Sequence, residues 1–124
     1  MSIQPLNEFQ HDYLATWTEP DPTLRRHAID RIWAPGGRLV MSSPGITVEG
    51  VNDIAVHITQ VHDDLIADKH LIFTYDQAAE TGDALLLRWS MLTPTGDVAG
   101  RGADVVFRDT DGRATTAYMF MGIT

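Results

Sequence analysis

The sequence predicts a single α+β domain in which three N-terminal helices pack on a curved antiparallel sheet. Two observations predict this fold class. Apolar residues recur at helical spacings in the first half of the chain, and short apolar runs separated by turn signals fill the second half. The length of 124 residues fits one domain, residues 1–124, with one hydrophobic core.

Two helices are expected first. Asn7 is the predicted cap of the first helix, which ends at Glu19-Pro20. Its inner face is formed by Phe9, Tyr13, Leu14 and Trp17. Asp21 is the predicted cap of the second helix, with Pro22 at the first helical position, where proline is well tolerated. The second helix is expected to end at Pro35-Gly36-Gly37 and to bury Leu24, Ala28, Ile29, Ile32 and Trp33.

A short strand over residues 38–42 and a third helix follow. Ser43-Pro44-Gly45 breaks the strand, and the helix is expected from near Val51 to about Leu65. Its apolar stripe consists of Ile54, Ile58, Val61 and Leu65. His57 falls on the same face, three residues after Ile54 and four before Val61.

Four strands are predicted near 70–79, 84–93, 98–108 and 114–123. The turn signals between them are Thr81-Gly82-Asp83, Thr95-Gly96-Asp97 and Asp111-Gly112. Sequential hairpins of this kind form an antiparallel meander, and we expect the helices to cover one of its faces.

The run over 84–93 indicates which face is which. Leu85, Leu87, Trp89 and Met91 alternate onto one side, which we expect to meet the helices. The other side carries Leu86, Arg88, Ser90 and Leu92 and is still partly apolar. A second subunit covering this side would explain it, so we predict a homodimer through the outer sheet face. A monomer with a few exposed leucines is the alternative.

Composition excludes several classes of partner. The net charge of −8 disfavours binding to nucleic acid or to an anionic membrane surface, so neither partner is expected. No run approaches the roughly 20 apolar residues of a membrane helix, and Met1 to Leu14 lacks the pattern of a signal peptide. The chain has no cysteine, which suits a cytoplasmic protein without disulfides.

Several local strings, together with the order of elements, resemble the nuclear transport factor 2-like superfamily. They are Tyr13-Leu14-Ala15 leading to Pro20-Asp21, Trp33 to Arg38 leading to Ser43-Pro44, Gly50, and Asp104 followed by Phe107 and Asp111-Gly112-Arg113. This superfamily includes ketosteroid isomerases and SnoaL-like cyclases. The resemblance covers nearly the whole chain and implies a cone-shaped fold that encloses an apolar pocket.

The comparison with ketosteroid isomerases implies candidate catalytic residues. Their tyrosine and aspartate donors, which stabilise an enolate-like oxygen, correspond to Tyr13 and Asp104. Their catalytic aspartate base corresponds to Ser43, and a serine has no basic group of its own. His57 is the best candidate for a replacement base, because imidazole titrates near neutral pH.

Each of the three candidates has a structural alternative. Asp104 shares a strand face with Gly100, Gly102 and Val106. An inward carboxyl without a cation nearby would have a raised pKa and could donate a hydrogen bond in its neutral form. It could equally be a structural aspartate bonded to a tyrosine or to the backbone. Tyr13 and His57 could likewise be core residues whose polar atoms are satisfied locally.

The remaining pocket wall is assigned to inward apolar residues. They are Trp17, Trp33, Met41, Ser43, Leu87, Trp89, Met91, Ala117, Met119 and Met121. Such a wall suits a small hydrophobic molecule, although the side chains could also fill the space themselves. No cofactor and no metal is expected, since His62, Asp63, Asp64, Asp68 and His70 match no standard ligand spacing.

The sequence leaves three functions open. The first is an isomerase, cyclase or dehydratase that transfers a proton on a carbonyl or polycyclic substrate. The second is a binding protein without catalysis, which the serine at position 43 favours. The third is a dimeric interaction domain with a filled core.

Overall fold

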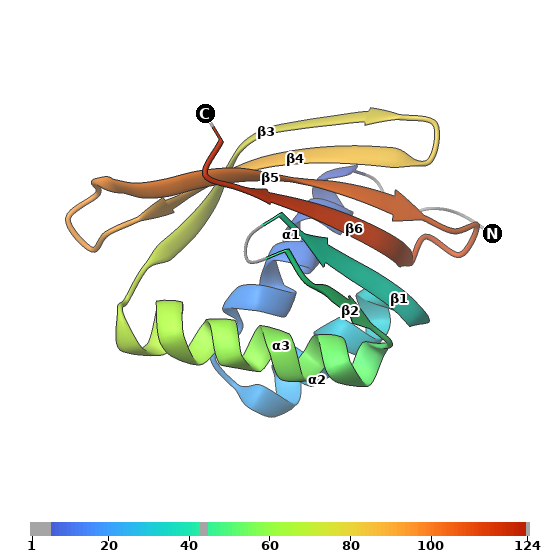
Figure 1. The fold of residues 1–124 in the computed structure, drawn as a ribbon, viewed down its shortest axis with the longest axis horizontal. Coiled ribbons are helices and arrows are strands. Elements are labelled where there is room, and N and C mark those ends of the chain that lie inside the picture. The colour runs from blue at the N-terminus through green and yellow to red at the C-terminus, as the bar shows by residue number, and fades with distance from the viewer. Residues whose placement is uncertain (1–5, 43–44, 124) are drawn as a thin grey trace.

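The computed structural model describes residues 6–42 and 45–123 and shows three helices beneath one bent sheet (Figure 1). The elements are α1 (Leu6–Thr18), α2 (Pro22–Ile32), β1 (Trp33–Met41), β2 (Thr47–Glu49), α3 (Val51–Val61), the π-helical segment η1 (His62–Asp68), β3 (Ile72–Thr81), β4 (Ala84–Leu92), β5 (Val98–Arg108) and β6 (Ala114–Met121). The helices lie on one side of the sheet, so the predicted fold class is confirmed.

The predicted start is confirmed for α2 but not for α1. Asp21 caps α2, and its carboxylate accepts hydrogen bonds from the backbone N–H groups of Thr23 and Leu24 at 2.8 and 3.2 Å. The predicted cap at Asn7 is wrong, because α1 already begins at Leu6. The predicted burial of Leu24 is also wrong, since its side chain is 53% exposed. Arg25 is buried instead, and its guanidinium donates to the Glu19 carbonyl oxygen.

The sheet contains six strands in the order β2-β1-β6-β5-β4-β3. The meander from β3 to β6 is antiparallel, as predicted. Two features differ from the prediction. The strand β2 was not expected, and β1 runs parallel to β6, so the sheet is mostly rather than wholly antiparallel. In addition, α2 ends at Ile32 and β1 begins at Trp33, which already has an extended backbone. Pro35-Gly36-Gly37 therefore lies within β1 and does not end the helix, and the strand starts five residues before the predicted residue 38.

The two faces of β4 divide as the alternation predicted. Leu85, Leu87 and Trp89 are buried against the helices, and Met91 on the same face is half-buried. On the outer face, Ser90 is buried as well, and its hydroxyl donates to Asp76 at 2.5 Å. Asp76 lies where the pairing of β3 with β4 slips between Tyr75 and Gln77, which places an extra residue beside Ser90.

Among the described residues, no helix has both the length and the apolar character needed to span a membrane.

Candidate functional site

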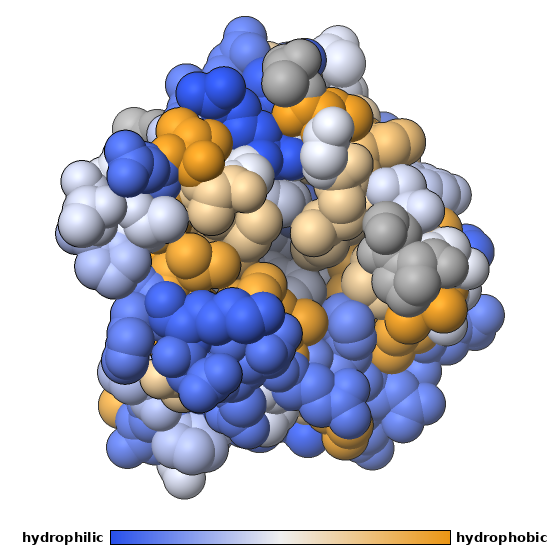
Figure 2. Space-filling model, turned by 60° about the vertical axis from the view of Figure 1, so that its left-hand side comes forward, coloured by the Kyte–Doolittle hydropathy of each residue, from blue (hydrophilic) through white to orange (hydrophobic). Residues whose placement is uncertain are grey.

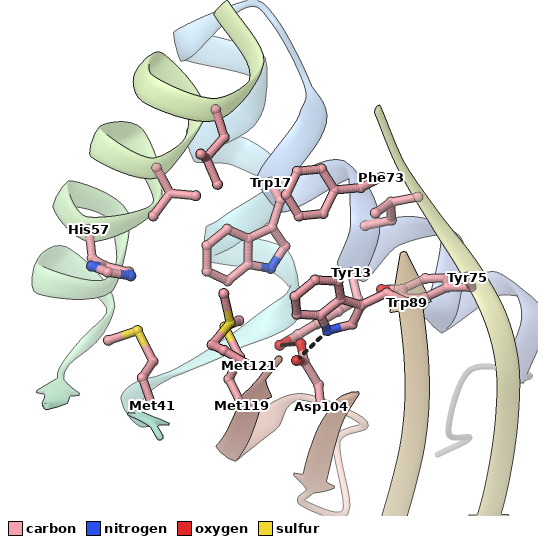
Figure 3. Close-up of a pocket in the computed structure, with 13 residues that line it drawn as sticks. Tyr13, Trp17, Met41, His57, Phe73, Tyr75, Trp89, Asp104, Met119 and Met121 are labelled. Atoms are coloured by element: carbon pink, nitrogen blue, oxygen red, sulfur yellow. Dashed lines mark hydrogen bonds between the residues drawn. The ribbon is translucent and has the colours of Figure 1, made fainter. Parts of the chain in front are cut away.

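Three residues from three elements meet at the centre of the inner sheet face. Tyr13 of α1 donates its hydroxyl proton to Oδ2 of Asp104 on β5 at 2.9 Å. Trp89 of β4 donates its indole N–H to Oδ1 of the same carboxyl at 3.0 Å. Figure 3 shows the three side chains grouped on one wall of a cavity. The predicted site residues Tyr13 and Asp104, 91 positions apart, are therefore in direct contact.

The strand register explains how Trp89 reaches Asp104. Trp89 pairs with Gly102 across β4 and β5, and Leu87 pairs with Asp104, so Trp89 and Asp104 are diagonal neighbours on one face. A side chain at Gly102 would collide with the Trp89 ring and would come within 2.5 Å of the Phe120 carbonyl oxygen. Because Gly102 has no side chain, the indole can lie flat across β5 with its N–H directed at the carboxyl.

Burial dominates the electrostatics of Asp104. Its side chain is only 2% exposed, and desolvation raises its pKa from an ordinary 3.8 to about 6, while the hydrogen bonds from Trp89 and Tyr13 oppose the rise. At pH 7 a pKa near 6 leaves about ten ionised carboxyl groups for each neutral one. The carboxyl thus changes charge close to neutral pH.

The two nearby tyrosines remain neutral. Burial, followed by the negative charge of Asp104, raises the pKa of Tyr13 and of Tyr75 well above the ordinary 10.0. Both hydroxyl groups are therefore hydrogen-bond donors throughout the physiological range.

The cavity beside this group has a volume of about 210 Å³. It is lined by Tyr13, Leu14, Trp17, Met41, His57, Val61, Leu65, Phe73, Tyr75, Trp89, Asp104, Met119 and Met121. In Figure 2 the surface is hollowed, and hydrophobic side chains surround the hollow. The polar groups in the lining belong to the hydrogen-bonded side chains Tyr13, Trp89 and Asp104, to the Trp17 indole N–H, to the Tyr75 hydroxyl and to one imidazole.

That imidazole belongs to His57 on α3, which lies across the cavity from Asp104 (Figure 3). Its ring meets the Trp17 ring edge to face, with centroids 6.2 Å apart. Partial burial lowers the pKa of His57 below the ordinary 6.5. His57 is therefore mostly neutral at pH 7 and can accept a proton from a molecule held in the cavity.

Most of the predicted site residues line this cavity. They are Tyr13, Trp17, Met41, His57, Trp89, Asp104, Met119 and Met121. Trp33, Leu87 and Ala117 lie outside the lining, because they are fully buried in the core behind it. Met91 also lies outside the lining, with its methyl group next to Gly100. Ser43 falls outside the described residues.

Five lining residues were not predicted as site residues: Leu14, Val61, Leu65, Phe73 and Tyr75. The first three belong to helical stripes that the sequence did indicate. Phe73 and Tyr75 are spaced by two on β3, and this spacing was the available signal for a shared inward face.

The described residues include no group of three or more histidine, aspartate or glutamate side chains placed to hold a metal ion. The acidic cluster around His62 is not such a group. His62 itself is buried, and Asp63 and Asp64 are exposed.

Solved structures with the same fold are common. A candidate isomerase of the SnoaL-like family from Agrobacterium tumefaciens str. C58 has a TM-score of 0.83 at 27% identity, covering 94% of this chain and 96% of that one. A protein with a ketosteroid isomerase-like fold from Catenulispora acidiphila DSM 44928, in complex with trimethylamine, has a TM-score of 0.69 at 17% identity, covering 93% and 85%. A nuclear transport factor 2-like protein from Exiguobacterium sp. 255-15 has a TM-score of 0.70 at 18% identity, covering 94% and 99%.

The last two matches show the fold alone. No protein-family model matches the sequence, and no curated protein matches it.

Proposed function

Since this chain has the fold of the nuclear transport factor 2-like superfamily, we propose that it is a proton-transfer enzyme. The reaction is an isomerisation, cyclisation or dehydration of a small hydrophobic substrate that carries a carbonyl oxygen. The observation that carries this proposal is a carboxyl with a pKa of about 6 on one cavity wall and a neutral imidazole on the other. An acid that titrates close to neutral pH and a base that is neutral at pH 7 suit general acid–base catalysis.

Asp104 interacts with the substrate oxygen while its own carboxyl is protonated and neutral. A ligand oxygen that gains negative charge beside the carboxyl raises the pKa of Asp104 further, because two like charges repel. The complex therefore takes up a proton at Asp104, which then donates a hydrogen bond to that oxygen. Trp89 supports this role by holding Oδ1 in place. In the resting structure the Tyr13 hydroxyl donates to Oδ2 of Asp104, and it becomes the second donor to the ligand oxygen once Oδ2 is protonated and the hydroxyl turns towards the ligand.

His57 acts as the base. The apolar surroundings keep its imidazole neutral, and its position across the cavity places a bound substrate between it and Asp104. A carbon next to a carbonyl that points at Asp104 is then turned towards His57. His57 removes a proton from this carbon, which leaves an enolate whose negative charge develops on the oxygen next to Asp104.

The test is hydrogen exchange at carbon in D2O. Bicyclic ketones such as 2-tetralone are incubated with the protein, and deuterium uptake next to the carbonyl is followed by NMR. We expect uptake roughly 100-fold above buffer, a rate gain typical of one positioned base. The His57→Gln variant should lose most of that gain. The matched control is His27→Gln, since His27 is exposed on α2. Uptake at the buffer rate with every ketone that binds would refute the proposal.

A binding protein without catalysis is the second candidate. In the resting structure Tyr13 donates to Asp104 and not into the cavity, which favours a structural use of this pair. Such a protein would bind the same ketones, and its affinity would depend on Trp17 or Trp89 with no deuterium uptake. The exchange experiment therefore separates the two candidates.

A further inference from the structure

The carboxyl of Asp104 has no cationic partner among the residues that the structure describes. The ion pairs within residues 6–42 and 45–123 all lie elsewhere, and the two hydrogen bonds to Asp104 come from the uncharged groups of Tyr13 and Trp89. A buried carboxylate without a counter-charge is costly. A positive charge bound in the cavity would remove that cost.

The cavity wall next to the carboxyl is aromatic. Five rings line it, those of Tyr13, Trp17, Phe73, Tyr75 and Trp89. Phe73 and Trp89 pack together with ring centroids 5.8 Å apart. Aromatic rings attract cations, and the attraction grows when water is excluded. The net charge of −8 also draws cations towards the protein.

We propose that this cavity binds small hydrophobic ammonium ions, with the positive nitrogen held between the Asp104 carboxylate and the aromatic rings. The inference uses the cavity on which the proposed function also rests, but it uses the ionised form of Asp104. The same carboxyl thus selects two ligand classes: carbonyl compounds when it is neutral and ammonium ions when it is ionised.

The two classes should respond to pH in opposite directions. A cation stabilises the carboxylate, so its affinity should rise with pH through the pKa of Asp104, near 6, and then level off. The other titratable groups around the cavity are Tyr13, Tyr75 and His57. The tyrosines stay neutral in this range. Protonated His57 would also repel a cation at low pH, so its contribution needs a control.

The experiment compares two molecules of nearly the same shape. Phenyltrimethylammonium carries a permanent charge, and tert-butylbenzene is its uncharged carbon isostere. Binding is followed by the fluorescence of Trp17 and Trp89 between about pH 5 and pH 8. At pH 8 we expect the ammonium ion to bind about tenfold tighter than the isostere, the scale of one cation–aromatic contact. At pH 5 the preference should largely disappear.

Variants assign the effect to residues. Asp104→Asn should remove the preference for the ammonium ion at every pH. Phe73→Leu should weaken ammonium binding several-fold while changing the affinity for tert-butylbenzene less. His57→Gln should retain the pH dependence, since Asp104 is its source. If Asp104→Asn fails to fold, the pH dependence of ammonium binding by the wild type still tests the inference.

Equal affinity for the two molecules at pH 8, or a preference that does not change with pH, would overturn the inference. In that case, binding of tert-butylbenzene would leave the proposed function intact. Failure of both molecules to bind would overturn the inference and would also remove the cavity that the proposed function needs. Ammonium binding without deuterium uptake from ketones would support the inference and refute the proposed function alone.

Discussion

Asp104 makes the stability of the folded chain depend on pH. Its pKa rises from 3.8 to about 6 on folding, so the folded state binds a proton more tightly than the unfolded state does. The stabilisation from this proton is complete below about pH 4 and is lost as pH rises through about 6. Between about pH 4.5 and 7.5 the loss amounts to about 2 kcal/mol.

The substitution Asp104→Asn removes this titration. Both proteins are unfolded in urea across this pH range. As pH rises from about 4.5 to 7.5, the free energy of unfolding of the variant should increase by about 2 kcal/mol relative to that of the wild type. A constant offset is also expected, because an amide in place of the carboxyl accepts only one of the two hydrogen bonds well. Comparing the two proteins cancels every other titrating group. A difference that is flat with pH would mean that the carboxyl is hydrated in the folded state.

At the scale of the elements, the close packing of β4 on β5 depends on Gly102. An added methyl group would meet the Trp89 ring and the Phe120 carbonyl oxygen, so Trp89 would have to move away from Asp104. We expect Gly102→Ala to lower the free energy of unfolding by about 1–3 kcal/mol, as overpacking does. It should also weaken ligand binding and shift the tryptophan fluorescence spectrum, because the surroundings of Trp89 change.

Gly36 on β1 offers the matched control. A methyl group there would meet nothing within 4 Å, so Gly36→Ala should leave stability within about 0.5 kcal/mol of wild type and should not change ligand binding. If Gly102→Ala bound ligands as wild type does, the position of Trp89 would not matter for the site.

The elements also show how far sequence patterns reach. The hairpins of the meander could be predicted because each turn contains a glycine at positive φ: Gly82, Gly96 and Gly112. The strand β2 has only three residues, too few to show an alternating pattern. The slip in pairing after Tyr75 could not be predicted either, because the residues of a bulge are ordinary and only the partner strand reveals it.

The candidate site was predictable in part, because side-chain periodicity shows which residues face inward. Side-chain alternation indicated the inward face of β4 and β5, and the helical stripes indicated Tyr13 and His57. The hydrogen bond of Trp89 to Asp104 depends on the register between two strands, which the sequence alone does not supply. Side-chain alternation also does not show whether an inward residue lies next to the cavity or deeper in the core. For this reason Leu87 and Ala117 were assigned to the pocket wall, although they lie in the core.

At the scale of the whole molecule, the outer sheet face exposes aromatic side chains that a partner could cover. Tyr118 and Phe120 lie on β6 in the middle of the sheet, and they are 37% and 43% exposed. Phe107 of β5 meets Tyr118 edge to face with ring centroids 6.1 Å apart. Aromatic residues gathered on an open sheet face are typical of a surface that another protein covers.

We therefore predict a homodimer through this outer face. Sedimentation velocity should give the mass of two chains for the wild type and of one chain for Tyr118→Lys/Phe120→Lys, because a charge buried at a subunit contact is strongly unfavourable. Val56→Lys is the control, since Val56 is 58% exposed on α3 and away from the sheet. This variant should remain a dimer. A wild type that sediments as one chain would contradict the prediction, whereas a dimer that survives both lysines would place the contact on another surface.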